Sequence, residues 1–148
     1  MLYSLKLTLS VTLILFIYIA DTNTVHANME VDAPLEITGV TKVSSEDIFK
    51  LFEKLSDLVI IDARITSDRK HGYIEGSVNL PDLETNCRTL AKLIPTKKTP
   101  VLFYCNGVKC GRSVNSSKTA LKCGYSNIYW FRGGFEEWKS KNMPFLKQ

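Results

Sequence analysis

The sequence lacks a dense cluster of basic residues. Lysine and arginine together number 19 against 15 aspartates and glutamates, which gives a formal net charge of +4 over 148 residues. Beyond residue 27 no run of lysine and arginine is longer than two residues, as at Lys97-Lys98. Because proteins that bind nucleic acid gather positive charge on one face, the sequence predicts no nucleic-acid partner. The diffuse surplus favours small anionic molecules only modestly.

Histidine is scarce, and internal repeats and low-complexity segments are absent. His71 is the only histidine after residue 27 and lies in a predicted loop. A lone loop histidine is usually just solvated, so no general-base role is assigned to it. Apolar residues make up 45% of the chain, which is enough for a packed core and argues against wholesale disorder. The length fits one domain.

No apolar run reaches the roughly 20 residues that a membrane-spanning helix needs. Residues 7–20 are apolar and uncharged, and Val25-His26-Ala27 follows as a small-x-small pattern. Together they predict that residues 1–27 are a secretory signal peptide and that the protein is periplasmic or secreted. Membrane contact is expected only if this segment stays uncleaved as an anchor. No cysteine lies directly after the apolar run, where a lipoprotein would carry its lipid.

The rest of the chain alternates between strand and helix patterns. Residues 28–37 are polar and are expected to form an exposed leader to a domain over 38–146. In chain order the expected elements are a helix over 46–55, strands over 58–61 and 78–80, a helix over 83–94, a strand over 100–104, a helix over 114–122, a strand over 128–131 and a helix over 135–139. Since the strands are apolar throughout, the predicted class is α/β, with a mainly parallel sheet and helices on both faces.

Cys105 directly follows the strongest strand pattern. In a parallel sheet, ligands bind beyond the carboxyl ends of the strands. The loop amides and the start of the next helix are expected to lower the pKa of the Cys105 thiol, making it a nucleophile. The same loop would hold a small anion, with Ser113 in a supporting role. The expected substrate-binding residues are Asn106, Gly107, Val108, Lys109, Cys110, Gly111 and Arg112. The alternative is that Cys105 is a small buried apolar residue.

The other cysteines allow more than one interpretation. Cys110 either packs at the start of a helix or attacks an oxidised form of Cys105 to form a disulfide. Cys87 and Cys123 fall on apolar helix faces and are expected to be buried thiols. Export would permit a structural disulfide, but a domain of this size does not need one.

Four segments resemble the motifs of the single-domain rhodanese family and occur in the family's order. Residues 60–64 (IIDAR) resemble its strand-ending I-D-x-R, and residues 72–81 (GYIEGSVNLP) resemble G-H-I-x-G-A-x-N-x-P, with Tyr73 where histidine is usual. Residues 103–105 (FYC) resemble the strand leading to the active cysteine. Residues 124–138 (GYSNIYWFRGGFEEW) resemble the closing G-Y-x-x-V-x-x-L-x-G-G-x-x-x-W.

The resemblance implies a rhodanese-like fold and a thiosulfate sulfurtransferase. The Cys105 thiolate would take a sulfane sulfur from a small anionic donor such as thiosulfate, become a persulfide, and pass the sulfur to cyanide or another thiol. No metal or organic cofactor is implied. Asp62 and Arg64 would support the loop or the domain rather than act in catalysis.

The loop departs from the family pattern C-x-x-G-x-R. Cys110 stands where the family has a basic residue, so Arg112 or Lys109 is the candidate replacement. Phosphatases and arsenate reductases of this fold use C-x5-R, whereas the interval from Cys105 to Arg112 is C-x6-R and fits neither form. The main alternative is a thiol-redox or binding module in which Cys105 and Cys110 form a switch.

Overall fold

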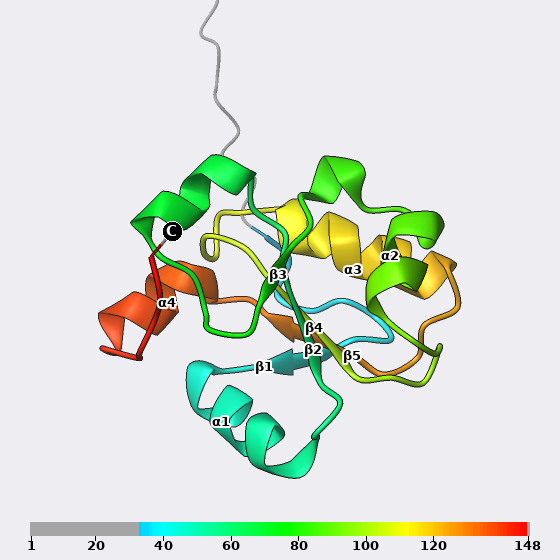
Figure 1. The fold of residues 1–148 in the computed structure, drawn as a ribbon, viewed down its shortest axis with the longest axis horizontal. Coiled ribbons are helices and arrows are strands. Elements are labelled where there is room, and N and C mark those ends of the chain that lie inside the picture. The colour runs from blue at the N-terminus through cyan, green and yellow to red at the C-terminus, as the bar shows by residue number, and fades with distance from the viewer. Residues whose placement is uncertain (1–32, 148) are drawn as a thin grey trace, which may run out of the picture.

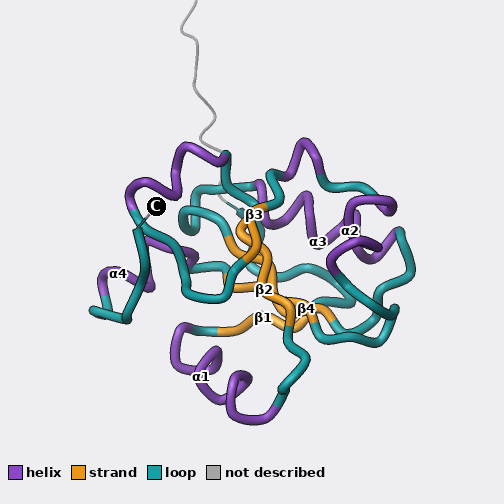
Figure 2. The backbone as a smooth tube through the Cα atoms, viewed as in Figure 1, coloured by secondary structure: helices purple, strands orange, loops and turns teal. Residues whose placement is uncertain are grey.

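The computed structural model describes residues 33–147, so the predicted signal peptide lies outside the described residues. A five-stranded sheet forms the centre, in the order β1-β5-β4-β2-β3, and every strand pairing is parallel. The strands are β1 (Thr41–Val43), β2 (Val59–Asp62), β3 (Val78–Asn79), β4 (Val101–Tyr104) and β5 (Ile128–Phe131). Figure 2 shows the strands crossing the middle of the molecule with loops and helices around them.

Helices cover both faces of this sheet (Figure 1). They are α1 (Ser45–Lys54), α2 (Cys87–Leu93), α3 (Arg112–Lys122) and α4 (Gly134–Ser140), with 3-10 turns η1 (Thr66–His71) and η2 (Asp82–Glu84). Successive side chains of a strand point to opposite faces. In β4, Phe103 packs toward α2 and α3, whereas Tyr104 packs toward α1 and α4. The expected α/β fold class is therefore confirmed.

The prediction of a helix over 83–94 is wrong for the first part of that range. The chain forms the short turn η2 and then starts α2 only at Cys87. Asn86 causes this start, because its side chain accepts hydrogen bonds from the backbone N–H groups of Arg88 and Thr89. A capping box formed by Ser44 and Asp47 starts α1.

The sequence predicted that residues 28–37 form an exposed leader. In the described part of this segment, residues 33–37, that prediction is wrong for two side chains. Ala33 and Ile37 are buried against Val114 and Trp130. Arg132, which directly follows β5, donates hydrogen bonds to the carbonyls of Pro34 and Ala33, each at 2.9 Å. Two apolar side chains among the polar ones are thus enough to fix residues 33–37 to the domain.

The expectation that Cys87 and Cys123 are buried thiols is also wrong. They form a disulfide with a Cα–Cα distance of 5.4 Å, joining the first residue of α2 to the end of α3. Cys87 is exposed and Cys123 is half-buried. Helical periodicity places a residue on a face but does not show which residue of another helix lies beside it. Within residues 33–147, no helix has the length and apolar character to cross a membrane.

Candidate active site

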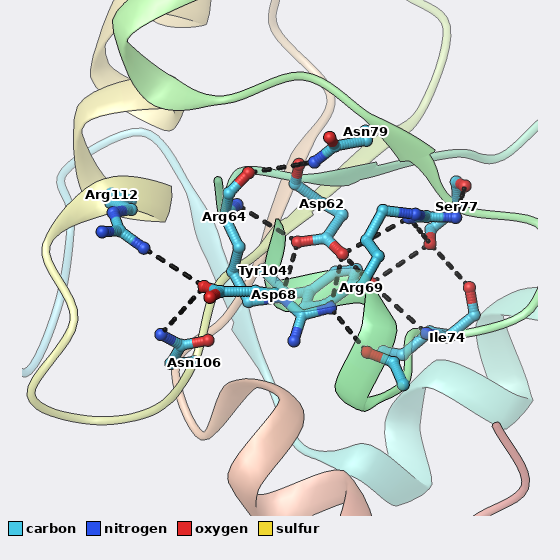
Figure 3. A network of polar contacts seen from close by, with 11 residues as sticks. Asp62, Arg64, Asp68, Arg69, Ile74, Ser77, Asn79, Tyr104, Asn106 and Arg112 are labelled. Atoms are coloured by element: carbon cyan, nitrogen blue, oxygen red, sulfur yellow. Dashed lines mark hydrogen bonds and ion pairs between the residues drawn. The ribbon is translucent and has the colours of Figure 1, made fainter. Parts of the chain in front are cut away.

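A buried ionic network supports the region at the carboxyl ends of β2 and β4 (Figure 3). The fully buried Asp62 accepts hydrogen bonds from Arg64, at 2.8 Å and 2.6 Å, and from the Tyr104 hydroxyl at 2.8 Å. Arg69 lies 3.4 Å from the same carboxylate. Arg64 also donates to the carbonyl of Gly72 at 2.9 Å. Asp62 and Arg64 therefore satisfy one another and anchor the loop after β2, which supports the structural interpretation of both residues.

Cys105 lies just past β4, the middle strand, and is almost fully buried, with 1% of its surface exposed. Its Sγ atom lies 3.1 Å from the carbonyl oxygen of Cys110 and 3.1 Å from the hydroxyl of Ser113. The Trp130 indole N–H donates to that hydroxyl oxygen at 2.9 Å. This leaves the Ser113 proton available to the sulfur, so the expected supporting role of Ser113 has a geometric basis.

The expectation that the loop lowers the pKa of Cys105 does not hold in this structure. Burial raises the pKa of the Cys105 thiol well above its usual range, and its hydrogen bond to Cys110 raises it further. Ser113 lowers it, but by less. The main reason is that the fold buries Cys105 almost completely, and the carbonyl oxygen of Cys110 accepts a hydrogen bond from the Cys105 S–H group at 3.1 Å.

The loop stabilises negative charge on Cys110 instead. The hydrogen bond from Cys105 lowers the pKa of the half-buried Cys110 thiol to about 6, and backbone N–H groups of Asn106 and Arg112 lower it further, as does the Arg112 charge. Burial alone would raise this pKa. Two backbone N–H groups of the loop that was expected to act on Cys105 thus lower the pKa of Cys110. Residue type alone could not show which of two sulfurs in one loop the amides face.

The remaining predicted loop residues serve different purposes. Val108, Lys109 and Gly111 are exposed, whereas Gly107 is buried against the side chain of Glu136. The carbonyl of Val108 accepts a hydrogen bond from the backbone N–H of Ala33 at 2.8 Å. The leader is therefore bonded directly to this loop.

The Gly133-Gly134 pair positions the loop, a role that sequence reasoning missed. The backbone N–H groups of Phe135 and Glu136 donate to the carbonyls of Cys105 and Asn106 at 2.9 Å and 2.7 Å. Gly134 has φ 58° and lies so close that a Cβ there would collide with the Cys105 carbonyl oxygen. The signal was present in the doubled glycine of the motif at residues 124–138, to which no role was assigned.

Arg112 does not stand as an isolated anion-binding charge. Its guanidinium lies 3.4 Å from the carboxylate of Asp68, to which the Asn106 amide also donates at 3.4 Å. In Figure 3 both side chains point toward Asp68 from the loop and α3. Asp68 was not predicted, because a charged residue in a loop carries no periodic or motif signal. An anionic donor would have to compete with Asp68 for Arg112.

An open cleft of about 450 Å³ lies beside the loop. It is lined by Arg64, Asp68, His71, Asn106, Phe135, Glu136 and Lys139. Both signs of charge occur on its walls, and His71, which had been assigned no function, borders it. Cys105 itself is not part of the lining.

The fold and the loop together define a parallel α/β domain with a cysteine loop between its middle strand and a helix. The chain belongs to the rhodanese-like family, since the family model described as Rhodanese-like domain matches residues 46–141. It is 31% identical over 121 residues to a putative mitochondrial thiosulfate sulfurtransferase of Schizosaccharomyces pombe, covering 68% of this chain and 83% of that protein.

Two further proteins are similar to this chain. The Escherichia coli protein YibN is 27% identical over 92 residues, and the match spans only 62% of each chain. The solution structure of a polysulfide-sulfur transferase homodimer from Wolinella succinogenes has a TM-score of 0.59 and 24% identity, covering 74% of this chain and 80% of that one. This last likeness establishes the fold alone.

Proposed function

We propose that this protein is a sulfurtransferase that carries a sulfane sulfur as a persulfide on Cys105. The observation that carries the proposal is the position of Cys105 at the carboxyl end of the middle strand, held by Ser113 at the start of α3. Membership of the rhodanese-like family and the similarity to a putative thiosulfate sulfurtransferase support it.

The proposed donor is a small anionic sulfur compound such as thiosulfate, and the acceptor is cyanide or a thiol. The half-buried Arg112 is the candidate to bind the donor's negative charge, and Lys109 adds an exposed cation to the same loop. Attack of the Cys105 sulfur on the donor's outer sulfur would release sulfite. The acceptor would then remove the outer sulfur and regenerate the thiol. The chemistry proposed for this loop uses no metal or organic cofactor.

We also propose that the mature protein is exported and starts at Asn28. The apolar residues 7–20 with Val25-His26-Ala27 support this. The Cys87–Cys123 disulfide supports it independently, because disulfides persist in oxidising compartments and are rare in the cytosol. N-terminal sequencing of protein recovered from the periplasm or medium tests cleavage. Full-length protein found only in membranes would indicate an uncleaved anchor.

Intact mass spectrometry tests the sulfurtransferase proposal. After incubation with thiosulfate, the reduced domain should gain about 32 Da, the mass of one sulfur atom, and peptide mapping should place it on Cys105. Cyanide should remove the adduct and yield thiocyanate. Cys105→Ser should show neither adduct nor turnover, while Lys118→Ala, an exposed change on α3, should match the wild type. Substantial turnover by Cys105→Ser would rule out Cys105 as the carrier.

A thiol-redox module is the second candidate, favoured by the two free cysteines Cys105 and Cys110 in one loop, where the Cys105 sulfur lies 3.1 Å from the Cys110 carbonyl oxygen. Such a module would form a Cys105–Cys110 disulfide under mild peroxide and recover fully with dithiothreitol. Cys110→Ser should instead be inactivated irreversibly, because no second thiol traps the sulfenic acid. Equal recovery of variant and wild type would count against this candidate.

A further inference from the structure

The peptide bond between Cys110 and Gly111 turns its carbonyl oxygen toward the sulfur of Cys105. The Cys105 S–H group donates to this oxygen across 3.1 Å, and Cys105 is 1% exposed. None of the peptide bonds within residues 33–147 is cis. Because a trans peptide is planar, its N–H group points the opposite way from its carbonyl. The Gly111 N–H group therefore points away from the sulfur in this structure.

This orientation suits a neutral thiol but not the two forms of Cys105 that sulfur transfer needs. A thiolate has no proton to donate, so its negative charge would face the lone pairs of the Cys110 carbonyl oxygen. In a persulfide the Cys105 sulfur is bonded to a second sulfur and also carries no proton. In both forms the contact with the carbonyl stops being a hydrogen bond. Ser113 would still donate to the sulfur from its hydroxyl, which lies 3.1 Å away.

Gly111 has no steric need to be glycine in the conformation observed. Its φ of −80° and ψ of −8° are accessible to any residue, and a Cβ placed there meets no atom within 4 Å. By contrast, a Cβ at Gly107 or Gly134 would collide with its surroundings. The glycine at position 111 therefore points to a second backbone conformation, one that other residues adopt less readily.

Building on the proposed function, we propose that the Cys110–Gly111 peptide flips when Cys105 becomes a thiolate or a persulfide, so that the Gly111 N–H group donates to the Cys105 sulfur. The backbone angles of Gly111 are those of the third residue in a type I turn. Flipping the central peptide of such a turn gives a type II turn, which needs a φ of about +80° at that residue. Glycine adopts this angle without steric cost.

The peptide groups on either side allow the flip to stay local. The Cys110 N–H group donates to the Gly107 carbonyl at 2.9 Å, and the Asn115 N–H group donates to the Gly111 carbonyl at 3.0 Å. Neither hydrogen bond involves the flipping peptide, so both survive. In the described part of the chain, Asn142 is the only residue other than glycine with a positive φ. Cys110 thus has a negative φ, which permits both helical and extended values of ψ.

The flip exchanges a hydrogen-bond acceptor for a donor beside the reacting sulfur. When the thiol loses its proton to solvent, the thiolate gains the Gly111 N–H group and no longer faces the carbonyl dipole. Hydrogen bonds to the charged form stabilise that form. When the acceptor removes the outer sulfur of the persulfide, Cys105 departs as a thiolate against the same donor. Protonation of the sulfur then returns the carbonyl to its inward orientation. The Gly111 N–H group is therefore a catalytic group in both halves of the cycle.

A chemically made analogue of the persulfide tests the flip without any enzymatic activity. Methyl methanethiosulfonate converts a cysteine to its methyl disulfide, in which the sulfur is bonded to a second sulfur and has no proton. In Cys110→Ser, Cys105 is the one free cysteine left for the reagent. Crystal structures of this variant before and after the reaction should show φ of Gly111 changing from about −80° to about +80°. The Gly111 N–H group should then point at the Cys105 sulfur.

Kinetics of Gly111→Ala test whether the flip matters for sulfur uptake. Since alanine fits the observed conformation, Tm should stay within about 4 °C of the wild-type value. Sulfite release in a single turnover with thiosulfate at pH 7 should be about 5–30-fold slower, the cost of a positive φ for a residue with a Cβ. Gly111→Asn should lose less, because asparagine enters this region more readily. Lys118→Ala should match the wild type.

Alkylation by iodoacetamide at pH 7 separates the flip from the proposed function, because its rate follows the thiolate fraction. In the Cys110→Ser background, Gly111→Ala should slow alkylation of Cys105 by the same factor. If the wild type takes up no sulfur, the sulfurtransferase proposal fails, while the alkylation rates and the methyl disulfide structure still decide the flip. Equal alkylation rates with and without Gly111→Ala, or a φ that stays near −80° in the methyl disulfide form, would refute the flip.

Discussion

The disulfide between Cys87 and Cys123 should contribute a large share of the domain's stability. The two cysteines are 36 residues apart, so the bond removes about 13 cal/mol/K of entropy from the unfolded chain, or about 4 kcal/mol at 25 °C. For a domain of this size that corresponds to a fall in Tm of about 15 °C on reduction. Because the link joins α2 to α3 on one face of the sheet, its loss should loosen that face first.

Urea unfolding at pH 7 with and without dithiothreitol measures this contribution. The Cys105→Ser/Cys110→Ser background is the right one, because there the reductant can act only on the Cys87–Cys123 bond. Cys87→Ala/Cys123→Ala in the same background should match the reduced protein, which separates the bond itself from the reductant. A loss below about 1 kcal/mol, under a quarter of the chain-entropy value, would refute the reasoning.

Two other perturbations follow from the site. Asp62→Ala should lower the free energy of unfolding by about 3–5 kcal/mol, because it leaves the buried guanidiniums of Arg64 and Arg69 without their carboxylate. Urea unfolding followed by circular dichroism measures this loss, and a loss below about 1 kcal/mol would contradict the prediction. Arg112→Ala should raise the KM for thiosulfate about tenfold or more, the cost of a charged contact of about 1.5–3 kcal/mol, while Asp68→Asn should lower it by freeing Arg112. Unchanged KM values in both variants would show that the donor does not bind at this pair.

Four of the five strands could be predicted from the sequence because their signal is local, whereas the short and largely exposed β1 was missed. The apolar run over 128–131 coincides with β5, and β2 and β4 begin one residue later than their patterns suggested. Each run is bounded by polar residues or by proline, and burial of a strand on both faces leaves few other arrangements for such a run. The cysteine at the end of β4 was placed by the same reasoning.

What the sequence did not show depends on which residues meet across the fold. Helical spacing placed Cys87 and Cys123 on apolar faces, but their pairing depends on the relative positions of α2 and α3. Asp68 reaches Arg112 from a turn 44 residues earlier, and no pattern links the two. The inward carbonyl of Cys110 is a backbone orientation, which composition and motifs do not specify. The pKa values of the two thiols therefore differ because of their burial and hydrogen bonds, although both residues are cysteines.

The contacts of Ala33 with Arg132 and Val108 determine where the protein can be truncated or fused to a tag. A fragment limited to residues 46–141, the part that matches the family model, would omit β1 and would uncover the buried faces of Trp130 and Val114. An affinity tag or fusion partner joined close to residue 33 would begin one hydrogen bond away from Val108 in the cysteine loop. Carriers and labels therefore belong at the C-terminal end, where they leave this contact intact.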